Sequence, residues 1–169
     1  MDTIQKTTNK ILIKELPSMR VASYRIISAN PERDAVNYMK NLLKDRKLNL
    51  NNLKWFGIDI PVSETQQNIG LRGYEYWVCL PDDIKKFEGA TIKNIPISNY
   101  AVLRIKNPFE RPFDTISNGW LELHEWIKTT GFKTALDNPN RYMLEELIII
   151  EGETYIDLFY PVCIYEHSI

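Results

Sequence analysis

Two adjacent acids near the end of the chain, Glu145 and Glu146, have surroundings that could give a carboxylate unusual chemistry. Adjacent side chains of a strand point to opposite faces, so each acid shares its own face with apolar neighbours. These neighbours are Met143 and Leu147 on one face, and Leu144 and Ile148 on the other. A carboxylate there loses hydration, which raises its pKa unless a donor or a cation compensates. We expect one acid to attract a cation; the alternative is that one faces solvent while the other pairs with Arg141 or Arg104.

Aromatic residues near a third acid, Glu75, point to the same kind of ligand. In the segment 74–80, Glu75 and Trp77 share one strand face and Tyr76 lies on the other. Tyrosine and tryptophan rings hold organic cations within about 6 Å, at about 0.5–2 kcal/mol each. With Trp120 and Tyr155, these residues are candidates for an aromatic wall that binds flat or amphipathic cations. Packing in the core is the competing interpretation for each ring.

Other chemistries lack the residues that they need. Cys79 and Cys163 each lie in an apolar run, which is typical of buried free thiols. His124 and His167 are far apart and lack the spacing of metal ligands. The sequence has no phosphate-binding glycine loop and no spacing that suggests a Ser/His/Asp set. We therefore expect no metal and no cofactor.

Length and charge narrow the class of protein. The 169 residues, 44% of them hydrophobic, fit one globular domain. A formal net charge of −1 gives no long-range positive field, so direct nucleic-acid binding is not expected. No apolar run approaches the roughly 20 residues that cross a bilayer, and the polar start lacks a signal-peptide core. We expect a cytoplasmic protein that does not associate with membranes.

The elements that position these residues follow the same order in each half of the chain. After a polar tail at residues 1–10, the first half predicts two strands within 11–27, a helix near 32–46, and strands at 55–60 and 74–80. The second half predicts strands near 90–95 and 98–106, a helix near 115–130, and strands near 141–150 and 154–164. Helix signals are Asn30 and Asp114 as N-caps and Gly131 as a left-handed stop.

A shift of 79 positions lays residues 16–26 on residues 95–105, with four identities in eleven. Together with the shared order of elements, this indicates an internal repeat of approximately 11–88 and 89–169 within one domain, 11–169. We expect an α+β fold in which two strand-helix-strand-strand modules form one curved antiparallel sheet of about eight strands. Two long helices should flank a central groove, which is a natural site for a small molecule.

The second helix has an apolar stripe that orients one of the candidate aromatics. The stripe consists of Ile116, Trp120, Leu123 and Ile127. Since this face must pack against the sheet, Trp120 should point inward.

Several segments resemble the GyrI-like effector-binding domains, the small-molecule modules of many bacterial multidrug-responsive transcription activators. The segments are residues 13–17, 73–78, 120–127, 144–147 and 157–162. The resemblance implies a groove lined by aromatic rings around a buried acid that attracts lipophilic, often cationic, molecules. The matching acid here is Glu146, because apolar residues follow it as they follow the family's acid. Glu75 stands where family members commonly have an acid. Glu146, Glu75, Tyr76, Trp120 and Tyr155 are therefore the predicted ligand-binding residues.

Three functions remain at this stage. The first is a stand-alone module that binds an amphipathic, cationic or aromatic ligand without chemistry. The second, which the resemblance implies, is a hydrolase that detoxifies cyclopropane-bearing genotoxic compounds with a glutamate and a tyrosine in the same groove. The third is a protein-interaction module of the gyrase-inhibitor kind. The oligomeric state stays open, with a homodimer among the expected forms.

Overall fold

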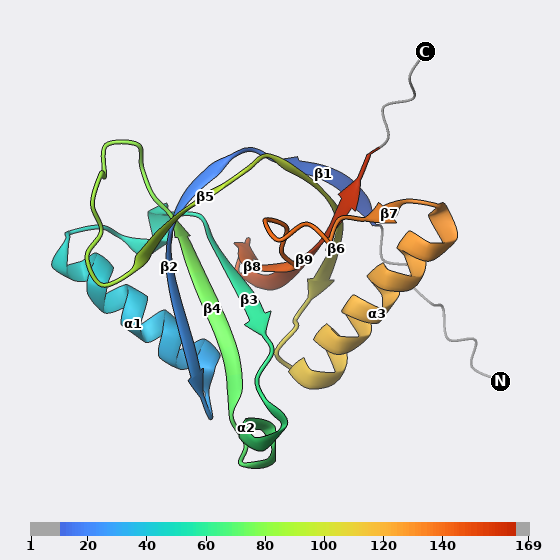
Figure 1. Cartoon of the computed structure of the whole chain (residues 1–169), viewed down its shortest axis with the longest axis horizontal. Helices are drawn as coiled ribbons and strands as arrows, with labels where there is room; N and C mark the ends of the chain where they lie inside the picture. Colours follow the sequence, from blue (N-terminus) through green and yellow to red (C-terminus); the bar gives the residue numbers. More distant parts are fainter. Residues whose placement is uncertain (1–10, 165–169) are drawn as a thin grey trace.

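The computed structural model describes residues 11–164 (Figure 1). The predicted polar tail, 1–10, and the last five residues of the predicted domain lie outside the described residues. The first half contains β1 (Leu12–Leu16), β2 (Met19–Ser28), α1 (Pro31–Asp45), a 3-10 turn (Leu50–Asn52), β3 (Trp55–Ile60), α2 (Glu64–Asn68) and β4 (Arg72–Cys79). The second half contains β5 (Thr91–Ile95), β6 (Ser98–Lys106), α3 (Pro112–Thr130), β7 (Lys133–Thr134), β8 (Leu144–Ile150) and β9 (Glu153–Cys163).

All strands of the described part pair in one antiparallel sheet, in the order β1-β6-β9-β8-β3-β4-β2-β5, with β7 added beside β9. The sheet curls, with α1 packed on β2 and β4, α3 packed on β6 and β9, and β3 and β8 between the two helices (Figure 1). This confirms the predicted α+β class and the antiparallel sheet. β3 and β8, one from each half, pair at the centre through Gly57 and Glu145.

Each long helix covers the strands of its own half with the apolar face that the sequence predicts. α1 buries Ala35, Met39 and Leu43 against β2 and β4. α3 buries Leu123 and Ile127 against β6 and β9. Trp120 is half-buried and packs against the same cluster, so the predicted phase of the helix is confirmed.

Local signals explain where the predicted boundaries are wrong. α3 begins at Pro112 with Arg111 as its N-cap, so Asp114 is a first-turn residue rather than the cap. Proline suits that first position because its missing N–H would be unbonded anyway. Gly131 does end the helix in the left-handed region, at φ 78°. The segment between the predicted strands 55–60 and 74–80 contains α2, which the Ser63–Gln66 capping box starts.

The two halves repeat an ion pair as well as an order of elements. Arg25 of β2 binds Glu75 of β4 at 2.6 Å, and Arg104 of β6 binds Asp157 of β9 at 2.7 Å. Both carboxylates are only 1% exposed. A lysine joins each pair, since Lys93 contacts Glu75 and Lys14 contacts Asp157. These two lysines are 79 positions apart in the sequence. These matched contacts are what a repeated module predicts.

Among the described residues, no helix is both long enough and apolar enough to cross a bilayer.

Candidate functional site

A cavity of about 430 Å³ lies between the two long helices, over the centre of the sheet. Its walls come from both halves of the chain, since α1, β3 and β4 supply one side and α3, β8 and β9 the other. The lining residues are Glu32, Val36, Trp55, Asp59, Arg72, Tyr74, Phe109, Pro112, Phe113, Ile116, Ser117, Glu145, Leu147 and Ile156. This groove is the candidate site.

Glu145 is the half-buried acid of the groove. Its Oε1 accepts a long hydrogen bond, 3.4 Å, from Nε1 of Trp120. Loss of hydration, together with the negative charges of Asp59 and Glu32, raises the pKa of Glu145 to about 7, against the opposing effect of the Trp120 bond. In the described part of the chain, Glu145 forms no ion pair. When ionised, its carboxylate therefore has no cation beside it within residues 11–164.

Gly57 makes room for an aromatic ring next to this acid. A Cβ built on Gly57 would lie 1.5 Å from the hydroxyl of Tyr74 and 2.3 Å from the ring carbon that carries it. The side chain of Tyr74 thus lies over Gly57, the residue of β3 that pairs with Glu145 of β8. Tyr74 is buried, and lost hydration with the charge of Glu145 raises the pKa of its phenol well above the ordinary value. It stays a neutral hydrogen-bonding group at the floor of the groove.

Charged residues also gather at the rim. Arg72 binds Glu32 through two hydrogen bonds, one of them 2.8 Å between Nη2 and Oε2. Asp59 is exposed and forms no ion pair within residues 11–164. Lost hydration and the charge of Glu32 raise the pKa of Asp59, while Arg72 opposes this. With Glu145, the lining holds three acids and one arginine, so an ionised groove is net negative.

Aromatic rings surround these charges. Trp55 and Tyr74 form the wall on the first half, while Phe109 and Phe113 stand at the mouth. Phe109 is 58% exposed and Phe113 is 73% exposed, large values for phenylalanine rings beside a cavity. The guanidinium of Arg72 lies 5.7 Å from the centre of the Phe113 ring, which shows that this ring already accepts a cation above its face. An apolar, aromatic, net negative groove suits an organic cation.

The sequence model of one protein family, described as the integron-associated effector binding protein Cass2, matches residues 12–162. The chain belongs to the Cass2 family. A family of effector-binding proteins binds small molecules, and the predicted resemblance to effector-binding domains is confirmed. A search of curated proteins found no match.

Solved structures resemble this Cass2-family chain at low identity. SAV2435, solved bound to tetraphenylphosphonium, has 14% identity and a TM-score of 0.59 over 94% of this chain and 97% of its own. The EcmrR C-terminal domain has 15% identity and a TM-score of 0.67 over 94% of this chain and 100% of its own. A hydrolase from Listeria innocua has 11% identity and a TM-score of 0.60 over 92% of each chain. At these identities the likeness concerns the fold.

Two of the predicted site residues of this Cass2-family chain lie at or behind the groove. Trp120 contacts Glu145 through its indole N–H. Tyr76 is fully buried beneath Trp55, with 5.1 Å between the ring centres, and its hydroxyl has no hydrogen-bond partner among the described residues. Tyr76 therefore supports the groove wall without lining it.

The other three lie on the sheet face that points away from the helices. Glu75 accepts hydrogen bonds from its neighbours Ser23 at 2.6 Å, Trp77 at 2.6 Å, Arg25 at 2.6 Å and Lys93. Although burial alone would raise the pKa of Glu75, these donors lower it to about 2. Glu146 pairs with Lys54 at 3.4 Å, and Tyr155 lies under Arg104 at 5.8 Å. The structure does not bring these three residues into the groove.

The residues that build the rest of the groove are not among those predicted from the sequence. Asp59 and Arg72 sit at strand ends, where a charged residue is unremarkable, and Phe113 lies in the first turn of a helix that begins earlier than predicted. Gly57 carried a usable signal, because a glycine inside a strand often marks a close approach by another group.

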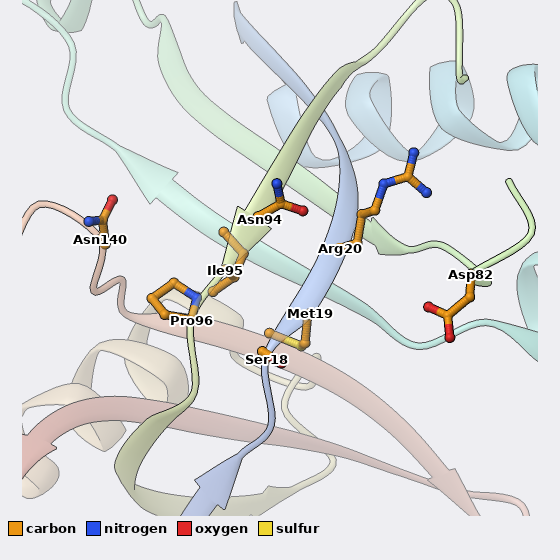
Figure 2. A pocket seen from close by; sticks show the side chains of 8 residues that line it. All are labelled: Ser18, Met19, Arg20, Asp82, Asn94, Ile95, Pro96 and Asn140. Atoms are coloured by element: carbon orange, nitrogen blue, oxygen red, sulfur yellow. The ribbon is translucent and has the colours of Figure 1, made fainter. Parts of the chain in front are cut away.

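A second hollow, of about 550 Å³, lies where β1 bends into β2 and β5 bends into β6 (Figure 2). Its lining is mostly polar: Ser18, Met19, Arg20, Asp82, Asn94, Ile95, Pro96 and Asn140. The Arg20 guanidinium is engaged with the next loop, since it donates to the carbonyls of Ile84 and, at 2.7 Å, Lys85. This hollow offers little apolar surface to an amphipathic molecule.

Proposed function

We propose that this chain binds an amphipathic organic cation in the groove between α1 and α3, with Glu145 as the groove's principal anion. The observation that carries the proposal is the half-buried carboxylate of Glu145, which lines an aromatic cavity and has no cationic partner within the described residues. An ionised carboxylate in such surroundings destabilises the folded protein when no cation compensates its lost hydration. A bound cation would offset that cost.

The walls suit a ligand with apolar bulk. Trp55, Tyr74 and Phe113 can contact rings or alkyl chains, and aromatic faces attract the positive charge that such a ligand carries. A cavity of about 430 Å³ falls in the range that holds drug-sized molecules. The tetraphenylphosphonium bound to SAV2435, a protein of the same fold, has this chemistry and supports the choice of ligand class.

The test compares two ions of one shape and opposite charge. Tetraphenylphosphonium and tetraphenylborate differ in their central atom, so apolar contact contributes about equally to both. We expect calorimetry to show saturable, one-site binding of the phosphonium and little or no binding of the borate. Equal binding of the two ions would contradict the proposed role of negative charge, and no binding of either would contradict the proposed function.

A hydrolase is the second candidate, because the groove pairs a carboxyl whose pKa is about 7 with the neutral phenol of Tyr74. Such a carboxylate could activate water while the phenol donates a hydrogen bond to a developing oxyanion. A hydrolase from Listeria innocua has the same fold. Chromatography after incubation separates the two functions, since a binding module returns an ultraviolet-absorbing ligand unchanged and a hydrolase does not.

A cytoplasmic location and no direct contact with nucleic acid stay predictions, and the oligomeric state stays open, with a homodimer among the expected forms.

A further inference from the structure

The groove contains two acids without cationic partners in the described chain, and they lie at different depths. Glu145 is half-buried at the centre of the sheet, while Asp59 is exposed at the rim. The third acid, Glu32, is already bound by Arg72 through two hydrogen bonds. Since Arg72 and Glu32 neutralise each other, Asp59 and Glu145, when ionised, each add one negative charge that has no ion-pair partner within residues 11–164.

The strand register fixes the spacing of these two acids. Gly57 pairs with Glu145, and Asp59 follows Gly57 by two residues along β3, so its side chain points to the same face. Asp59 and Glu145 are therefore diagonal neighbours across β3 and β8, about 7–8 Å apart at the backbone. Two cationic centres in one molecule can match this spacing.

An aromatic ring lies between the two acids. Tyr74 pairs with Asp59 in the sheet, and its hydroxyl end lies over Gly57, the residue that pairs with Glu145. Trp55 and Leu147 line the groove on the other side of the Gly57–Glu145 pair. A hydrocarbon or aromatic spacer would contact the Tyr74 ring while its two ends approach the two acids.

We propose that the groove prefers dications, molecules with two cationic groups joined by an apolar spacer, over monocations of the same bulk. One cationic group would pair with Glu145 inside the groove and the other with Asp59 at its rim. This inference rests on the proposed function, because it assigns a ligand class to the same groove.

The experiment uses polymethylene bis(trimethylammonium) ions of increasing chain length, each beside the matched alkyl monoammonium ion. Calorimetry with the whole chain gives the dissociation constants. The exposed position of Asp59 limits the expected preference for the dication to about two- to fivefold, the range of an exposed ion pair. Because the strand register fixes the spacing of the two acids, the preference should peak at one chain length rather than rise steadily.

Three variants assign the effect to residues. Asp59→Asn should remove the preference for the dication and leave the affinity for the monocation nearly unchanged. Asp83→Asn is the matched control, because it makes the same change of charge on an exposed loop outside the groove. Glu145→Gln should weaken binding of both ions by about tenfold to a hundredfold, because the coulombic attraction to the carboxylate is lost.

The outcomes separate this inference from the proposed function. If monocations bind but dications bind no more tightly, or if affinity rises with chain length regardless of Asp59, the dication proposal is overturned and the proposed function stands. If neither ion binds saturably, the proposed function itself is wrong. If Asp83→Asn and Asp59→Asn both remove the preference for the dication, the preference reflects general charge attraction, and the proposal is overturned.

Discussion

At the scale of single residues, Glu145 is held in its ionised form by little besides one long hydrogen bond from Trp120. Glu75 is also buried but accepts hydrogen bonds from four side chains, and its pKa falls to about 2 whereas that of Glu145 rises to about 7. The comparison separates two roles for a buried acid. Glu75 is satisfied by its own fold, and Glu145 has capacity left for a ligand.

The raised pKa of Glu145 predicts how stability depends on pH. An unfolded glutamate has the ordinary value of 4.5, and the folded value is about 7. Between these values the folded protein holds a proton that the unfolded chain has released, so stability falls as pH rises and the loss is complete above the folded pKa. Glu145→Gln cannot ionise. The variant should therefore melt higher than the wild type at about pH 8 and equally at about pH 4.

Thermal unfolding across this pH range checks the prediction. Glu122→Gln on the exposed side of α3 is the control, and it should follow the wild type closely. A difference between Glu145→Gln and the wild type that stays constant with pH would show that the carboxyl does not titrate in the way described.

At the scale of elements, the groove depends on how closely β3, β4 and β8 approach one another. Tyr74 occupies the place that a side chain at Gly57 would take. Gly57→Ala should displace this buried ring and destabilise the protein by about 1–3 kcal/mol, the usual cost of overpacking. It should also weaken ligand binding, because the floor of the groove changes. Urea denaturation measures the first effect.

A double-mutant cycle provides the control for this prediction. In a Tyr74→Ala background the ring is gone, so Gly57→Ala should cost little. If the substitution costs as much there as in the wild type, the backbone of β3 rather than the Tyr74 ring is what requires glycine.

The elements themselves could largely be predicted from the sequence, because periodicity and breakers are local. The strand at 55–60 has the predicted bounds, and both long helices lie where their apolar stripes place them. The choice between Glu145 and Glu146 could not be made in this way. β8 has apolar neighbours on both faces, so its sequence does not show which face meets the helices. The pairing of Glu145 with Gly57, on a strand distant in sequence, places Glu145 on the same face as Gly57.

At the scale of the whole molecule, the two halves meet so that neither alone forms the groove. One half contributes Trp55, Asp59 and Tyr74, and the other contributes Phe113 and Glu145. The matched ion pairs, Arg25–Glu75 and Arg104–Asp157, lie on the opposite face and link strands within each half. The fold thus places the buried ion pairs of each half on one sheet face, and the carboxyl of Glu145 on the other face, in the groove that both halves form.

The most direct test of this account is the affinity for tetraphenylphosphonium in the wild type, Glu145→Gln and Glu146→Gln, measured by calorimetry at about pH 8, where Glu145 is ionised. The two variants remove adjacent charges on opposite faces of β8. We predict that Glu145→Gln weakens binding by about tenfold to a hundredfold, through the lost coulombic attraction between two partly desolvated charges, while Glu146→Gln leaves it nearly unchanged. A loss confined to Glu146→Gln, or an equal loss in both variants, would contradict the assignment of Glu145 as the acid of the groove.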